Sequence, residues 1–123
     1  MGKMVTENAD ARNYVEMQSH GDVRVVVLAG EFDMDTVHEL RTAMDPEAPG
    51  VTRFVLDVGG VTFVDSTALS IMLQPVLDRH VVLAGEVPPR LARLLELTGA
   101  DRAFTKAASV PEAMVVDLPP RGR

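Results

Sequence analysis

The 123-residue sequence contains no cysteine and no tryptophan, and aromatic residues make up only 4% of it. Without cysteine the chain has no disulfides, no thiolate metal site and no cysteine redox switch. Hydrophobic residues nevertheless account for 46% of the sequence, so we expect a core built mainly from aliphatic side chains. That composition suits a small α/β layer structure.

Long apolar runs and an excess of positive charge are also missing. The longest apolar stretches are about five or six residues, far below the ~20 that span a bilayer, and the N-terminus has no apolar signal core. We therefore expect a cytoplasmic protein without membrane insertion. The formal net charge of −6 disfavours contact with a phosphate backbone, so direct nucleic-acid binding is not expected.

One compact domain is predicted, because two independent domains would need roughly 100 residues each. Residues 1–12 are polar and show no periodicity, which predicts a flexible N-terminal tail. Residues 119–123 contain two prolines and a glycine and are expected to form a C-terminal tail. The domain itself is assigned to residues 13–118.

Strand and helix patterns alternate along this domain. A hairpin is expected around His20-Gly21-Asp22, and later apolar runs predict strands at residues 54–64, 81–84 and 104–105. Helical spacing and capping residues predict helices near residues 37–44, 67–73, 89–98 and 110–117. Pro75 should leave the second helix short or kinked, because proline removes a backbone donor.

These elements predict an α/β fold with a four- or five-stranded mixed sheet and about four helices, mainly on one face. The carboxyl ends of parallel strands meet at one edge, where binding sites cluster in open α/β sheets. The expected core residues are Val25, Val27, Leu40, Leu56, Val58, Leu69, Leu83, Leu94 and Leu95.

The segment from Phe54 to Leu69 carries the most specific signal in the sequence. Its strand, short loop and final Asp-Ser-Thr-Ala-Leu closely resemble the central signature of STAS domains, in which Asp-Ser-Ser/Thr-Gly-Leu opens a helix. Gly-Glu-Phe-Asp at residues 30–33 is similar to the Gly-Glu-Leu-Asp of the family, and residues 90–99 resemble its penultimate helix. The resemblance covers roughly residues 14–118 and is to the anti-sigma factor antagonist (anti-anti-sigma factor) type.

This resemblance implies a bacterial regulator of transcription in the stress response that acts by partner switching and is not an enzyme. The unphosphorylated protein would bind an anti-sigma factor that is also a serine kinase, and phosphorylation of Ser66 would release it until a serine phosphatase removes the phosphate. Thr67 is the less favoured acceptor. Asp33, Asp65 and Thr67 are the expected partner-binding residues, and the chain itself needs no cofactor or metal.

Simpler roles for these residues compete with the regulatory ones. Asp65 and Ser66 can act as an ordinary helix cap, and Asp33 or Asp35 can cap the helix that follows. Regulation by phosphate nevertheless fits the chemistry of Ser66, because a helix start offers free N–H groups and the positive end of the helix dipole. A phosphate there would be tolerated by its own domain and would disturb a partner surface that accepts a neutral serine.

Two features depart from the family pattern. Ala68 stands where the family usually has glycine, which removes backbone freedom and could alter the surface presented to a kinase. The helix that contains Pro75 is also shorter than usual. Both features are compatible with a divergent partner or contact face.

Other classes of protein have less support. A serine hydrolase would need a histidine base for Ser66, but His20, His38 and His80 lie in no recognisable motif, and the sequence contains neither a phosphate-binding loop nor a zinc-protease motif. The remaining alternative is a phosphorylation-independent STAS adaptor or ligand-sensing subunit of a larger complex, such as a stressosome-like assembly or a lipid transporter. A homodimer is also compatible with the sequence.

Overall fold

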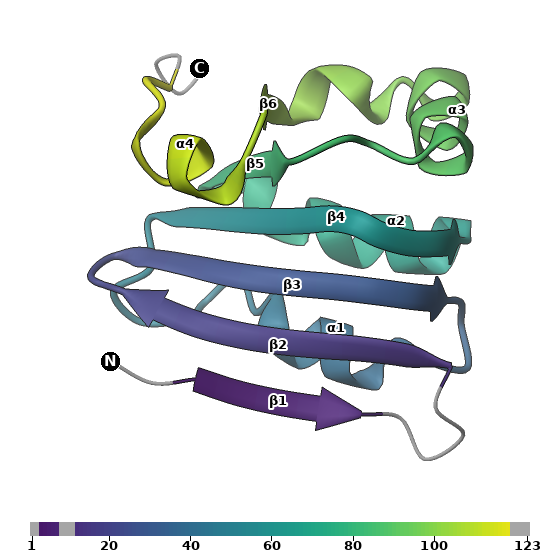
Figure 1. Ribbon diagram of the computed structural model, residues 1–123, viewed down its shortest axis with the longest axis horizontal. Helices are drawn as coiled ribbons and strands as arrows, with labels where there is room; N and C mark the ends of the chain where they lie inside the picture. Colours follow the sequence, from purple (N-terminus) through teal and green to yellow (C-terminus); the bar gives the residue numbers. More distant parts are fainter. Residues whose placement is uncertain (1–2, 8–11, 119–123) are drawn as a thin grey trace.

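The computed structural model describes residues 3–7 and 12–118, and its centre is a sheet in the order β1-β2-β3-β4-β5-β6 (Figure 1). Neighbours from β1 to β3 are antiparallel, and β3 to β6 are parallel. The strands are β1 (Lys3–Glu7), β2 (Asn13–His20), β3 (Val23–Phe32), β4 (Arg53–Val64), β5 (His80–Ala84) and β6 (Thr105–Ala107). The helices are α1 (His38–Ala43), α2 (Ser66–Leu73), α3 (Pro89–Thr98) and α4 (Val110–Val115), with 3-10 turns at Gln74–Leu77 and Ala100–Ala103.

β2 and β3 form the predicted hairpin. Their register pairs Asn13 with Gly30 and His20 with Val23, and the turn between them contains Gly21 at a φ of 64°. β3 is flanked by β2 and β4 and lies inside the sheet, and its middle is buried on both faces, with Val26 and Leu28 in one buried cluster and Val25 in the other. This position explains its nearly continuous run of apolar residues.

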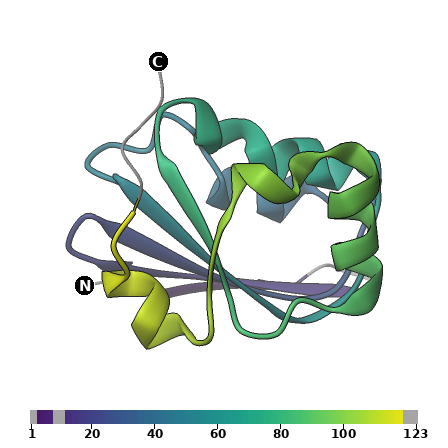
Figure 2. The ribbon, with the colours of Figure 1, turned by 90° about the horizontal axis from the view of Figure 1, so that it is seen from above.

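Helices cover the two faces of the sheet unequally (Figure 2). α1, α2 and α3 contribute Leu40, Leu69 and Leu95 to the larger buried cluster on one face. α4 lies on the opposite face, where Ala113 joins a smaller cluster with residues of β3 to β6. The predicted α/β fold with a mixed sheet and helices mainly on one face is therefore confirmed.

Most of the predicted core residues are buried. Val27 and Leu94 are partly buried and pack against the two clusters. The other seven are at most 3% exposed, and they are Val25, Leu40, Leu56, Val58, Leu69, Leu83 and Leu95. The aliphatic composition therefore produces the expected core, to which Phe32 and Phe54 add two fully buried aromatic rings.

The prediction of a flexible N-terminal tail is wrong for residues 3–7, which form β1 and pair with β2 from Lys3–Gln18 to Glu7–Tyr14. The sheet consequently has six strands and not four or five. An edge strand is held by backbone hydrogen bonds, which any sequence without proline can make, so hydrophobic patterning gives little sign of it. Arg12 is described and lies directly before β2, and the other residues assigned to the two tails lie outside the described parts of the chain.

The segment after Ser66 is short, as Pro75 predicts. α2 ends at Leu73, and Pro75 is buried in the 3-10 turn that follows. Proline is compatible with this turn because it occupies one of the first two positions, where a backbone donor is not needed. Among the described helices, none has the length and apolar character to cross a bilayer.

Candidate functional site: two loops at the carboxyl end of the sheet

β3 and β4 end side by side, and one loop leaves the sheet from each strand. Their last residues, Phe32 and Val64, are paired in register, so Asp33 and Asp65 follow at neighbouring positions. The Asp65 N–H donates a hydrogen bond of 3.0 Å to the carbonyl of Phe32. The Asp33 loop and the start of α2 therefore lie side by side at the carboxyl edge of the parallel strands. We call residues 33–36 the Asp33 turn and residues 65–68 the Ser66 segment.

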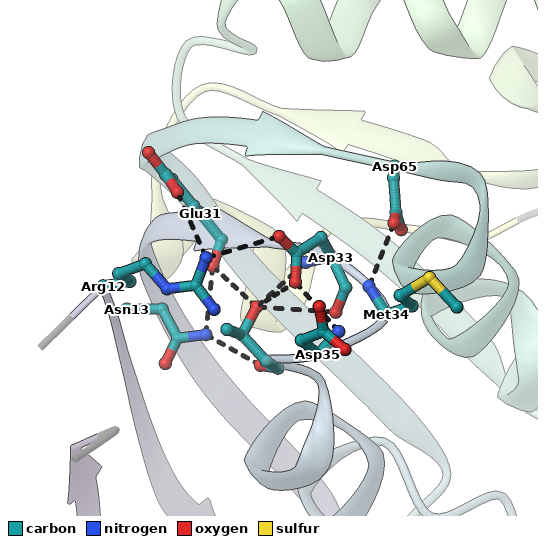
Figure 3. Close-up of polar contacts among 8 residues, drawn as sticks. Arg12, Asn13, Glu31, Asp33, Met34, Asp35 and Asp65 are labelled. Atoms are coloured by element: carbon teal, nitrogen blue, oxygen red, sulfur yellow. Dashed lines mark hydrogen bonds and ion pairs between the residues drawn. The ribbon is translucent and has the colours of Figure 1, made fainter. Parts of the chain in front are cut away.

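The carboxylate of Asp65 connects these two loops. Its Oδ1 accepts a hydrogen bond of 2.9 Å from the N–H of Ala68, which caps α2. Its Oδ2 accepts a hydrogen bond of 3.0 Å from the N–H of Met34 (Figure 3). The predicted capping role is correct, and the second oxygen adds a function that the sequence did not reveal, since it fixes the Asp33 turn beside the helix start.

Ser66 is the first residue of α2 and is exposed, whereas Thr67 is half-buried. In the described part of the chain the Ser66 hydroxyl has no hydrogen-bond partner. The hydroxyl is therefore accessible to another protein, and the first turn of α2 places backbone N–H groups close to it. This geometry suits the predicted phosphate acceptor, and the acceptor role itself stays a prediction.

Asp33 stabilises a turn and does not cap α1, which corrects the helix-cap prediction for Asp33 and Asp35. The first turn of α1 follows Val37, and no side chain caps it. Instead, Asp33 Oδ1 accepts a hydrogen bond of 2.9 Å from the N–H of Asp35, and the Asp33 N–H donates one of 2.9 Å to the hydroxyl of Thr36. Aspartate and threonine commonly make such local turn contacts, which compete with helix capping.

Thr36 and Asn13 are site residues that sequence reasoning missed. Both are buried, and the Asn13 amide donates hydrogen bonds of 3.0 Å to the Glu31 carbonyl and 2.8 Å to the Thr36 carbonyl (Figure 3). These contacts join the start of β2 to both sides of the Asp33 turn. The Asp-x-x-Thr spacing could have indicated the turn, but Asn13 is about 20 residues away and has no local signal.

Gly30 allows this close approach of β2 and β3. Its φ is 91°, and an added Cβ would lie only 2.2 Å from the carbonyl oxygen of Arg12. That carbonyl instead accepts a hydrogen bond of 2.9 Å from the N–H of Glu31. The glycine of the Gly-Glu-Phe-Asp motif is therefore required by backbone packing next to the Asp33 turn.

Ala68 contributes no side chain to the exposed surface of the site. Its side chain is fully buried, and its backbone is part of α2, with the N–H held by Asp65. Alanine is favoured over glycine in a helix by roughly 1 kcal/mol. The methyl group of Ala68 therefore lies in the core and makes no direct contact with a partner.

The surface around Ser66 is acidic and carries the exposed apolar side chain of Met34. Asp33, Asp35 and Asp65 surround Met34, which is 70% exposed. The guanidinium of Arg12 lies 3.6 Å from Asp33 Oδ2 and 4.0 Å from Glu31 Oε1 (Figure 3). An exposed methionine among charged groups is suited to contact with a protein. Across residues 3–7 and 12–118, no cluster of His, Asp and Glu has an arrangement that could hold a metal ion.

Comparisons with known proteins show which family the sequence and the fold resemble. Residues 15–117 match the family model described as Mlab, STAS domain. An anti-sigma-B factor antagonist of Staphylococcus epidermidis is 30% identical over 91 residues, which cover 69% of this chain and 83% of that protein.

Solved structures show the same fold. The anti-sigma factor antagonist from Mycobacterium paratuberculosis superimposes with a TM-score of 0.71 at 24% identity, covering 89% of this chain and 96% of that one. The Bacillus cell fate determinant SpoIIAA in its phosphorylated form gives a TM-score of 0.60 at 20% identity, covering 81% and 96% of the two chains. Since the family model spans most of the sequence, including both loops of the site, this protein belongs to the STAS domain family.

Proposed function

We propose that this protein is an anti-sigma factor antagonist that works by partner switching and performs no catalysis. With Ser66 unphosphorylated it binds an anti-sigma factor that is also a serine kinase, and the sigma factor is set free. Phosphorylation of Ser66 by that kinase ends the complex, and a serine phosphatase restores it. The kinship with the anti-sigma-B factor antagonist of Staphylococcus epidermidis supports the general role, and the site supports the mechanism.

The observation that carries this proposal is the position of Ser66. It is exposed at the first residue of α2, next to Asp65, whose carboxylate holds the Asp33 turn against the same surface. A partner that covers the Asp33 turn and Met34 would therefore also cover Ser66. Phosphorylation of the single Ser66 hydroxyl would then weaken binding of the partner to the whole surface.

A phosphate on Ser66 has different effects on the domain and on the complex. Within the domain, the helix dipole and the free N–H groups of the first turn favour a charge of about −1.5 to −2 at this position. The nearby carboxylates of Asp33 and Asp65 oppose that charge, so the phosphate must stay hydrated. A partner that buries Ser66 would remove this hydration, and the complex would lose affinity while the domain remains folded.

Phosphorylation is tested by incubating the protein with its cognate anti-sigma kinase and Mg-ATP and measuring the intact mass. We expect the mass of one phosphate on wild type, the same gain for Thr67→Ala, and none for Ser66→Ala. Ser66→Ala should also bind the kinase without release by ATP. Modification of Thr67 in wild type would move the acceptor by one residue and contradict the assignment.

The same experiment separates the proposal from a phosphorylation-independent adaptor. The description of the matching family model names the Mlab STAS domain and does not name an antagonist, so the experiment must also test this second candidate. An adaptor would gain no phosphate, and its wild-type, Ser66→Ala and Ser66→Asp forms would all bind the larger complex with the same affinity. These results would contradict the switching mechanism and favour the adaptor function.

A further inference from the structure

β4 is longer than its neighbour β5, and its second half has a strand on one side only. Pairing with β5 ends at Asp57 and Ala84, whereas pairing with β3 continues to Val64. Within the described chain no backbone hydrogen bond joins residues 58–64 to the segment between β5 and α3. We call residues 58–64 the free edge of β4. A strand edge of this kind presents backbone donors and acceptors that another strand can use.

A groove of about 460 Å³ lies along this free edge. One wall is formed by residues 59–62 of β4, and the other by Glu86, Pro88 and Pro89. The two prolines have no N–H group, so the segment between β5 and α3 is poorly suited to extend the sheet itself. The groove therefore separates the free edge from the nearest chain and leaves it open.

The β4 wall carries two consecutive glycines, and one of its backbone donors is already used, since the Gly59 N–H donates a hydrogen bond of 3.3 Å to Asp57 Oδ1. Gly59 and Gly60 are exposed, and a Cβ added to Gly59 would meet only the Asp57 carboxylate, at 3.6 Å. A second backbone can thus come close enough for hydrogen bonding, which requires strands about 4.7–4.9 Å apart. An α-helix cannot use such an edge, because its own backbone groups are already paired.

We propose that the free edge of β4 receives an extended, positively charged segment of the anti-sigma factor, which adds to the sheet as a strand. This inference rests on the proposed function and assigns a second contact to the same partner. Charge supports the choice, since exposed Glu86 lies on the groove wall and the Asp57 carboxylate lies 3.6 Å from where a Gly59 Cβ would stand. Position supports it as well, because the free edge leads directly into Asp65 and Ser66.

Hydrogen exchange of the complex tests the added strand directly. Amide exchange is followed by mass spectrometry on the full-length protein, alone and bound to its anti-sigma kinase. We expect slower exchange at residues 59–63 in addition to the Asp33 turn and the Ser66 segment, because strand addition protects backbone N–H groups. Contact through side chains at Ser66 alone would leave residues 59–63 unchanged.

Two substitutions probe the groove with matched controls. Gly59→Ile, which has room for its Cβ, should fill the groove and weaken the complex about tenfold or more. Ser19→Ile, at an exposed position of β2, should not. Glu86→Lys should weaken the complex severalfold and reduce its sensitivity to salt, whereas Glu47→Lys in the exposed loop before β4 should do neither. Circular dichroism checks that all four variants fold.

The outcomes distinguish this inference from the proposed function. A complex that protects the Asp33 turn and the Ser66 segment, but not residues 59–63, would overturn the added strand and leave the switching function intact. Absence of any complex would overturn both. If ultracentrifugation of the protein alone shows a dimer that Gly59→Ile dissociates, the edge pairs with a second copy and the assignment to the anti-sigma factor is wrong.

Discussion

The starts of α2 and α4 use the same capping device in different surroundings. At α2, Asp65 accepts a hydrogen bond of 2.9 Å from the N–H three residues on, and at α4 Ser109 does the same at 3.3 Å. Both starts carry an exposed serine. Asp65 has a second oxygen that holds the Asp33 turn, whereas in the described chain the Ser109 hydroxyl bonds to no other element. A cap becomes part of a site when it also joins a second loop.

The largest expected difference between the two helix starts is in partner binding. Ser66→Asp should weaken the complex with the anti-sigma kinase about 100-fold, equivalent to roughly 2.7 kcal/mol, because a charge would be buried in the contact. Ser109→Asp adds the same charge on the opposite face of the sheet, retains a capping side chain and should bind as wild type does. Titration calorimetry measures both. Equal affinities for Ser66→Asp and wild type would remove Ser66 from the interface.

The next difference is in stability. Asp65→Ala should lower the free energy of unfolding by about 2 kcal/mol, because it removes the cap of α2 and the hydrogen bond to the Asp33 turn. Ser109→Ala removes only a cap and should lower it by about 1 kcal/mol. Urea unfolding monitored by circular dichroism gives both values. Equal losses would show that the second oxygen of Asp65 adds nothing.

Substitution of Thr36 tests the Asp33 turn itself, and the same substitution at Thr42 on α1 is the control. Thr36→Val should destabilise the fold by about 1 kcal/mol, since the Asp33 N–H would lose its acceptor, the hydroxyl of the buried Thr36. Thr42→Val removes an exposed hydroxyl that bonds to the His38 carbonyl at 3.3 Å, and its effect should stay within about 0.5 kcal/mol. Urea unfolding applies again. A larger loss for Thr42→Val than for Thr36→Val would contradict the role given to Thr36.

The smallest effect is expected for the ion pair of the site. Arg12→Gln should change the free energy of unfolding by less than about 0.5 kcal/mol, because the guanidinium is partly exposed and lies 3.6 Å from Asp33 Oδ2. Lys106→Gln, which breaks an exposed pair with Asp101 far along the chain, is the control. The two variants should have similar midpoints in urea. A loss above roughly 1 kcal/mol for Arg12→Gln alone would make Arg12 a structural part of the turn.

Local signals in the sequence predicted the start of α2 well. Asp65 carries a capping side chain just before an apolar helix, and Pro75 limits the length of that helix. Both effects act between residues no more than about ten positions apart, so the local sequence is enough to predict where α2 begins and ends. The same holds for the hairpin around Gly21, whose positive φ favours glycine.

Contacts between distant segments were not predictable in this way. β1 depends on the unpaired edge of β2, and the Asp33 turn depends on Asn13, which reaches it only after β2 and β3 have paired. Asp33 was expected to cap a helix because aspartate serves equally well in a turn, and the Thr36 hydroxyl decides between the two. The free edge of β4 likewise depends on where β5 ends.

The two hydrogen bonds of Asp65 also bear on the thermodynamics of association. Ordering a flexible residue costs about 1–2 kcal/mol of backbone conformational entropy, and a loop that orders only on binding loses this amount from its affinity. Here Asp65 holds Met34 and the first turn of α2 in place before any partner arrives. This conformational entropy is lost during folding, so binding of a partner does not have to order these loops again. Which partner binds then depends on the chemistry of the exposed groups.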